Sequence, residues 1–272
     1  MSATEAPHLR THDDPQVAHL RWIVLDRPDA RNAWSDEMLA AFVDAIDDAD
    51  ADPAVRVVAL TGAGTAFSAG GDLKAMRDRA GMFAGDTMAL RGRYRRGIQG
   101  IPRRLARFDK PLIAAVNGAA IGAGLDLACM CDLRVASERA KFGSTFVKVG
   151  LVPGDGGAAL LQRVVGMPAA LDLVLTARVI RTDEAQRIGL VHRVVAPEAL
   201  EDAVRELAAA IAANPPLAVQ LTKSAVYRSQ HLSLEDALEL ASTYQGIVQR
   251  TADHDEGVAA ILEKRTPRFE GR

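Results

Sequence analysis

The sequence contains only two cysteines, Cys129 and Cys131, among its 272 residues. A single residue separates them, which is too close for a useful disulfide, and the chain offers no other cysteine as a partner. The six histidines show no spacing typical of metal ligands. We therefore interpret both cysteines as small buried apolar residues, and we expect a reducing, cytoplasmic environment and no metal site.

The chain also lacks an excess of charge of either sign and any long apolar segment. Its formal net charge is −2, so no basic field recruits nucleic acid. No apolar run approaches the length that spans a membrane. Residues 1–16 have neither a cationic start nor an apolar centre, so they do not resemble a secretory signal, and we expect a disordered N-terminal tail. Nucleic acid and membranes are therefore not expected partners.

What the chain has is a regular alternation of apolar runs and amphipathic segments. From residue 17 to 197 this alternation is typical of parallel strands with helical crossovers, and 55–60 and 111–116 predict strands buried on both faces. Ser35 predicts a helix N-cap, and 123–130 a further helix. Residues 198–272 predict consecutive amphipathic helices. The expected fold is an α/β core followed by a C-terminal helical region.

Two glycine-rich turns are the most informative feature of the sequence. Residues 66–72 (Ala-Phe-Ser-Ala-Gly-Gly-Asp) and 121–126 (Ile-Gly-Ala-Gly-Leu-Asp) each follow an apolar run and precede a helix-like segment. Two such turns can direct two free backbone N–H groups at one point, which is the simplest way to stabilise a negatively charged oxygen as it forms. The pair predicts chemistry through an enolate or a tetrahedral oxyanion.

A hydrolase is an alternative interpretation of the first turn. Ser68 lies in a sequence close to the G-x-S-x-G nucleophile elbow, and Asp126 or Asp155 followed by His192 would complete a triad in chain order. His192, however, lies in an apolar, strand-like run, which is the wrong context for a catalytic base. We therefore favour the oxyanion interpretation over a serine nucleophile.

Several further motifs occur in a fixed order along the chain. They are Leu-Asp-Arg-Pro at 25–28, Arg-Asn-Ala at 31–33, Phe-Ser-Ala-Gly-Gly-Asp at 67–72, Lys-Pro-Leu-Ile-Ala-Ala-Val-Asn-Gly at 110–118, Gly-Ala-Gly at 122–124, Gly-Leu-Val-Pro-Gly-Asp-Gly-Gly at 150–157, Gly-Leu-Val at 189–191 and Glu-Lys-Arg at 263–265. From residue 19 to 272 this series resembles the crotonase (enoyl-CoA hydratase/isomerase) superfamily. The resemblance implies a spiral of ββα units, with the acyl-CoA-binding core at 17–197 and a helical region at 198–272 that builds trimers or dimers of trimers.

The resemblance also implies a substrate and roles for individual residues. The substrate is an acyl-CoA thioester, so coenzyme A enters as part of the substrate and no separate cofactor is expected. The N–H groups of the oxyanion hole map onto Gly71 and Ala123. Contacts with the acyl group or coenzyme A map onto Arg27, Ala69, Asp72, Leu73, Phe146 and Lys264.

The sequence departs from the family pattern at both catalytic glutamates of the hydratases. The first maps onto Asp126 and the second onto Phe146, so activation of water by paired carboxylates is not expected. Asp126 follows Ala123 within one helical turn and is the expected acid/base. We interpret Asp155 chiefly as a helix N-cap, with a catalytic role as the alternative.

These features favour isomerase-type proton transfer. One carboxyl removes a proton from C2 of a 3-enoyl-CoA and returns it at C4, and an apolar Phe146 excludes water and raises the pKa of Asp126. The alternatives are an enoyl-CoA hydratase with an atypical water-activating group, an acyl-CoA thioester hydrolase, and a non-catalytic acyl-CoA-binding protein.

Overall fold

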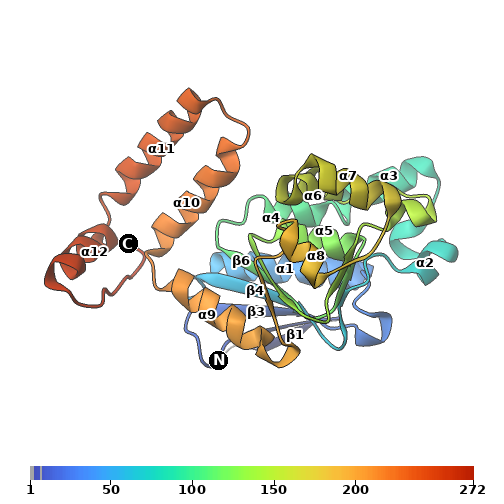
Figure 1. Ribbon diagram of the computed structural model, residues 1–272, viewed down its shortest axis with the longest axis horizontal. Coiled ribbons are helices and arrows are strands. Elements are labelled where there is room, and N and C mark those ends of the chain that lie inside the picture. Colours follow the sequence, from blue (N-terminus) through green and yellow to red (C-terminus); the bar gives the residue numbers. More distant parts are fainter. Residues whose placement is uncertain (1–2, 7) are drawn as a thin grey trace.

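Apolar runs separated by glycine-rich turns form two β-sheets at the centre of this computed structural model, which describes residues 3–6 and 8–272 (Figure 1). The larger sheet has seven strands in the order β1-β2-β3-β4-β6-β8-β11, and the smaller has four in the order β10-β9-β7-β5. The strands are β1 (Ala3–Ala6), β2 (Leu9–Asp13), β3 (Leu20–Leu25), β4 (Val57–Gly62), β5 (Ala66–Ser68), β6 (Leu112–Val116), β7 (Ala119–Ile121), β8 (Leu133–Ser137), β9 (Lys141–Gly143), β10 (Ile180–Arg181) and β11 (Arg193–Val195).

Each turn of the chain adds one strand to each sheet and then a helical segment. β4 and β5, β6 and β7, and β8 and β9 are such pairs, and successive pairs lie parallel to one another in both sheets. The intervening helices are α1 (Asp36–Ala51), α2 (Leu73–Arg77), α3 (Thr87–Arg96), α4 (Gly100–Leu105), α5 (Ala123–Met130), α6 (Gly157–Val165), α7 (Met167–Thr176) and α8 (Thr182–Arg187), with 3-10 turns at 28–30, 81–83, 146–149 and 197–199. This repetition confirms the predicted ββα spiral.

The N-terminal segment is ordered where the sequence predicted a disordered tail. β2 pairs antiparallel with β3, and β1 pairs with β2. Asp14 is buried and accepts hydrogen bonds from the indole of Trp22 and the guanidinium of Arg205, both at 2.8 Å. The prediction for residues 1–16 is therefore wrong for these strands, because backbone pairing at a sheet edge does not need an apolar sequence. Met1, Ser2 and Pro7 lie outside the described residues.

Two apolar clusters cover the two faces of the larger sheet. On one face α1, α4 and α5 cover a cluster that includes Phe42 of α1 and Phe108, which follows α4. On the other face α9 (Leu200–Ala212) packs Val204 and Ala208 against Trp22 and its neighbours. Helix α9 therefore belongs to the core, and the predicted boundary at residue 197 is one helix too early.

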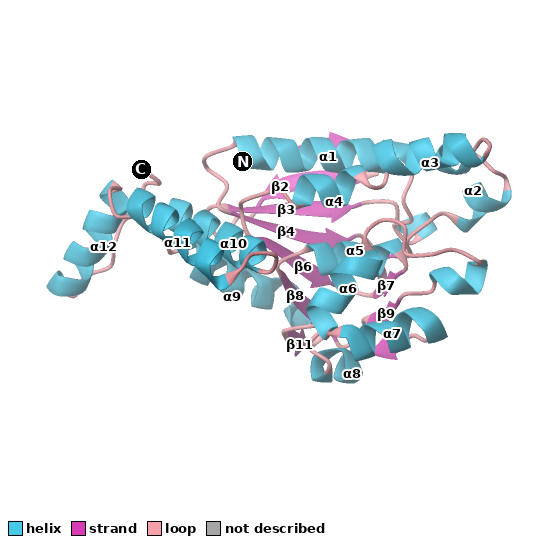
Figure 2. Cartoon of the chain, turned by 90° about the horizontal axis from the view of Figure 1, so that it is seen from above, coloured by secondary structure: helices cyan, strands magenta, loops and turns pink. Residues whose placement is uncertain are grey.

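Helices α10 (Pro216–Ser229), α11 (Leu234–Val248) and α12 (Ala252–Glu263) extend away from the sheets, on the side opposite α2 and α3 (Figures 1 and 2). They expose large apolar side chains, and Ile261 and Leu262 are each 79% exposed. An apolar surface of this kind is typical of a protein–protein contact, and the trimer stays a prediction. Among the described residues no helix has both the length and the apolar character to cross a bilayer.

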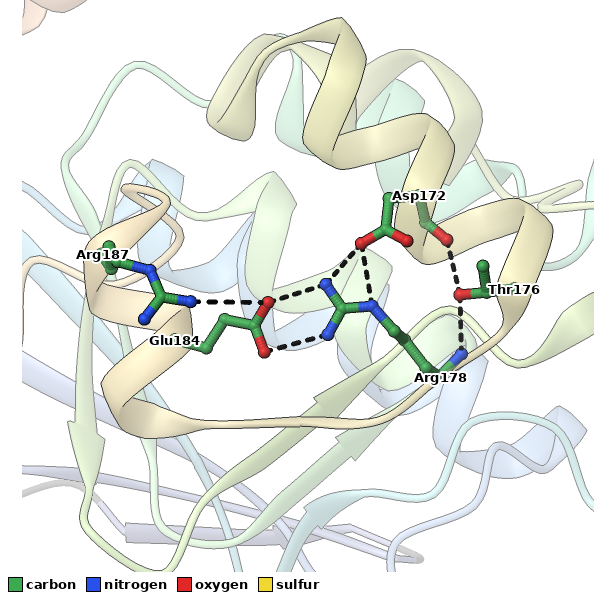
Figure 3. A network of polar contacts seen from close by, with 5 residues as sticks. All are labelled: Asp172, Thr176, Arg178, Glu184 and Arg187. Carbon is green, nitrogen blue, oxygen red and sulfur yellow. Dashed lines mark hydrogen bonds and ion pairs between the residues drawn. The ribbon is translucent and has the colours of Figure 1, made fainter.

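An ion network centred on Arg178 joins α7 to α8 (Figure 3). Arg178 pairs with Asp172 and Glu184, and these contacts raise the pKa of Arg178 and lower the pKa values of both carboxyls. A methyl group on Gly143 would lie 2.9 Å from Val179, the residue that follows Arg178. The network therefore orders the segment that supports the end of β9.

We expect Arg178→Gln to lower the urea midpoint of unfolding only slightly. The partners are partly exposed, and exposed ion pairs contribute little because solvent screens them. The difference from the wild type should disappear at about 1 M salt, where the Debye length falls to about 3 Å. A large decrease that persists at high salt would contradict this interpretation.

Candidate active site

The two glycine-rich turns lie side by side because the strands that precede them are neighbours. β5 pairs in parallel with β7, so both chains leave the sheet at the same edge. A methyl group on Gly124 would lie 2.2 Å from the carbonyl oxygen of Ser68, and one on Gly70 would lie 2.9 Å from the nitrogen of Ala123. Gly70 also has a φ of 82°, which disfavours other residues. Glycine is required at both positions for this approach.

The N–H groups of Gly71 and Ala123 are free at this junction. Within the described part of the chain neither donates a hydrogen bond to a backbone carbonyl. Ala123 is the first residue of α5, where the helix dipole and the unsatisfied donors favour negative charge. The ring of Phe146 lies 3.8 Å from a methyl group placed on Gly122, so it forms an apolar wall next to this end of α5. An arrangement of this kind can stabilise an oxyanion, and the roles of Gly71 and Ala123 stay predictions.

Two buried carboxyls, those of Asp126 and Asp155, interact next to the same helix end. Asp126 follows Ala123 by one helical turn, and Asp155 lies in the loop before α6. Their residues are 0% and 3% exposed, and among the described residues neither oxygen of Asp126 nor Oδ1 of Asp155 forms a hydrogen bond of ordinary geometry. The N–H of Gly157 is nevertheless close enough to Asp126 to offset part of the rise in its pKa. Gly157 permits this packing, because a methyl group there would lie 2.1 Å from Oδ2 of Asp126.

Burial raises the pKa values of both carboxyls. For Asp126 the loss of solvation is the largest cause, and the adjacent charge of Asp155 raises its pKa further, to well above the ordinary value. For Asp155 burial raises the pKa, and the contact with Asp126 partly offsets this effect. Two carboxyls in contact resist ionising together, so the pair shares one proton.

The interpretation of Asp155 as a helix N-cap is wrong. Helix α6 begins at Gly157, its N-cap is Gly156, and no side chain caps it. Gly156 has a φ of 109°, and this turn leaves the carboxyl of Asp155 with Asp126 rather than with the first turn of α6. The sequence signal for this contact was the Gly156–Gly157 pair: Gly156 permits the turn with positive φ, and Gly157 leaves room for the carboxyl of Asp126.

Helix α3 covers the loop that carries Asp155. The ring of Tyr94 lies 3.1 Å from a methyl group placed on Gly154, and Gln99 Nε2 donates a 2.7 Å hydrogen bond to the Gly154 carbonyl. Burial, followed by the charge of Asp155, raises the pKa of Tyr94. Tyr94 and Gln99 therefore hold the loop that carries Asp155 against the rest of the site.

Most of the residues predicted to contact coenzyme A gather next to Gly71. Arg27 pairs with Asp72 at 3.0 Å, and Asp72 also caps α2 by accepting from two backbone N–H groups. Leu73 is 62% exposed, and the N–H of Ala69 is bound to the carbonyl of Arg31. Their contacts with coenzyme A stay predictions.

Lys264 and the candidate hydrolase triad do not join this cluster. Lys264 directly follows α12, one of the helices that extend away from the sheets on the side of the molecule opposite α2 (Figure 1). Ser68 is fully buried and donates its hydroxyl to the carbonyl of Asn32 at 2.8 Å. His192 Nδ1 accepts from the N–H of Arg134 instead. Neither side chain is arranged for nucleophilic catalysis.

Comparison with known proteins places this chain in one family. The model of the enoyl-CoA hydratase/isomerase family matches residues 17–272. The chain belongs to this family. It is 39% identical to a crotonyl-CoA hydratase of Syntrophomonas wolfei, over 91% of this chain and 93% of the relative. It is 38% identical to the 1,2-epoxyphenylacetyl-CoA isomerase of Escherichia coli, over 92% and 94%.

Solved structures of the family share the fold. An enoyl-CoA hydratase from Bacillus anthracis is 34% identical, with a TM-score of 0.89 over 96% of this chain and 99% of that one. One from Mycobacterium smegmatis is 36% identical, also with a TM-score of 0.89, over 97% and 99%. This member of the enoyl-CoA hydratase/isomerase family is therefore a crotonase-fold enzyme that acts on acyl-CoA thioesters.

Proposed function

We propose that this enzyme moves the double bond of a 3-enoyl-CoA to the 2-position. The observation that carries the proposal is the contact between Asp126 and Asp155, two buried carboxyls with raised pKa values. A pair that shares one proton contains both a base and an acid at neutral pH, and bound substrate needs both in turn. Asp126 is the acid/base and Asp155 the residue that exchanges the proton with it.

In this mechanism the thioester oxygen accepts hydrogen bonds from the N–H groups of Gly71 and Ala123. The ionised carboxyl of the pair removes a proton from C2, and the electrons move into the carbonyl to form a dienolate. The two donors stabilise the new negative charge, an effect worth several kcal/mol for such sites. Return of the proton at C4 forms the C2–C3 double bond and restores the carboxylate, so no water is consumed.

Hydration of a 2-enoyl-CoA is the second candidate reaction, and the position of the Asp155 carboxyl next to Asp126 is the observation that favours it. The second carboxyl restores a pair of acids, which hydratases use to activate water and to protonate C2. Phe146 stands at the family's second glutamate position and is apolar, and the two aspartates contact each other rather than enclosing a polar space. These features favour isomerisation over hydration.

Mass spectrometry of 2-enoyl- and 3-enoyl-CoA incubated with the enzyme in D2O distinguishes the two reactions. We expect deuterium incorporation and migration of the double bond without addition of water. Asp126→Asn serves as the control for proton transfer, and exposed Asp172→Asn as the control for loss of a carboxylate. A water adduct as the sole product would replace the isomerase proposal with hydration.

A further inference from the structure

A cavity of about 400 Å³ lies between α4, the end of α5, α6 and α10. Its apolar lining includes Leu105 and Phe108, which are buried, and Met130 and Leu160, which are partly buried. The volume falls in the range of about 300–1,000 Å³ that is typical of small-molecule sites.

The wall of this cavity includes residues that pack against the turn after Asp155. Pro102 and Leu160 line the cavity, and both lie within 3.6 Å of a methyl group placed on Gly156. Gly156 directly follows Asp155 in the chain, and Gly157 packs against Asp126. Pro102 and Leu160 therefore lie between the cavity and the turn that follows Asp155, and an acyl chain must pass them to enter the cavity.

The charges around the cavity favour an anion. Arg107, Arg163, Arg228 and His231 line it, are exposed, and form no ion pair with any described residue. The negative charge of Asp132 is balanced by an ion pair with Lys223 at 2.8 Å, and Asp132 also accepts a hydrogen bond from the hydroxyl of Tyr227 at 2.9 Å. The remaining acid in the lining is Asp109, which is exposed.

We propose that this cavity binds the far end of the acyl group and that this end carries a carboxylate. The apolar lining suits the methylene chain, and a guanidinium such as that of Arg163 can bind a carboxylate through two parallel hydrogen bonds. Arg163 is the specificity-determining residue, since α6 carries it one turn after Leu160. The inference rests on the proposed function, because it assigns the acyl group that the acid pair processes.

The test compares two 3-enoyl-CoA substrates of equal chain length, one ending in a methyl group and one in a carboxylate. We expect the kcat/KM of the wild-type enzyme to be at least about tenfold higher for the carboxylate-ended substrate. The difference should come from a lower KM, with kcat similar for the two substrates. Arg163→Gln should remove this preference and leave turnover of the neutral substrate unchanged. Arg187→Gln is the matched control, because Arg187 is an exposed arginine in α8, outside the cavity lining.

Binding of saturated acyl-CoA, measured by calorimetry, separates this inference from the proposed function. Saturated thioesters have no double bond to move, so their affinities report the cavity even if no enoyl-CoA is converted. Tighter binding of the carboxylate-ended compound, lost in Arg163→Gln, supports the proposal. Equal affinities in the wild-type enzyme, or a preference that Arg163→Gln leaves intact, would overturn it.

Discussion

Asp126→Asn should lower kcat for double-bond migration by about 10³-fold, because general acid–base groups contribute roughly 10²–10⁴ to rate. Asparagine keeps the shape of the side chain but cannot take up a proton. Binding of the acyl-CoA should change little, since the N–H groups of Gly71 and Ala123 are unaffected. The measurements are kcat and KM on the substrate that the wild type converts best. Full turnover by the variant on every such acyl-CoA would exclude Asp126 as the acid/base.

The same substitution should stabilise the folded enzyme, most strongly at high pH. The native pKa values of Asp126 and Asp155 lie above their ordinary value of 3.8. The free energy of unfolding is therefore highest at pH values below 3.8, where the carboxyls are protonated in both the folded and the unfolded state. It decreases as the pH rises through the raised native pKa values. Asp126→Asn removes the ionisable partner, so its melting temperature should depend less on pH than that of the wild type. A variant with the wild-type pH dependence would show that the pair does not titrate as described.

Gly124→Ala should destabilise the enzyme by at least about 3 kcal/mol, toward the upper end for single substitutions. The added methyl group would lie 2.2 Å from the carbonyl oxygen of Ser68 and 2.8 Å from its carbonyl carbon. Both are backbone atoms of the strand that leads to Gly71, so relief of the clash must separate the two turns. We expect lost activity as well as lost stability, measured by urea unfolding and by turnover.

Gly100→Ala is the matched control for this effect. Gly100 begins α4, and a methyl group there meets no atom within 4 Å. The substitution should be neutral or slightly stabilising, because alanine favours helix more than glycine. Equal losses in both variants would show that steric contact between the turns is not the cause.

Local patterns in the sequence predicted the parts of the fold that local interactions determine. The side chain of Ser35 caps α1 as expected, and α5 spans the residues that the sequence assigned to it. The adjacent glycine turns were predictable because each follows a buried parallel strand.

Features that depend on tertiary contacts were predictable only in part. Nothing local distinguishes α9, which packs on the sheet, from α10, which extends away from it, since both are amphipathic segments. The packing of Asp155 with Asp126 depends on a turn at Gly156 with positive φ, and an aspartate before a helix usually indicates a cap. The N-terminal strands are held by edge pairing, which leaves no apolar pattern in the sequence.

The spiral distributes the active site over successive windings of the chain. Gly71 follows the first ββ pair, Ala123 and Asp126 follow the second, and Phe146 and Asp155 follow the third. During folding, a chain that has completed only the first two windings would hold both oxyanion donors but only one of the two carboxyls. With the proposed roles of these residues, we therefore expect activity during refolding to recover with the docking of the third winding rather than with the formation of the first sheet strands.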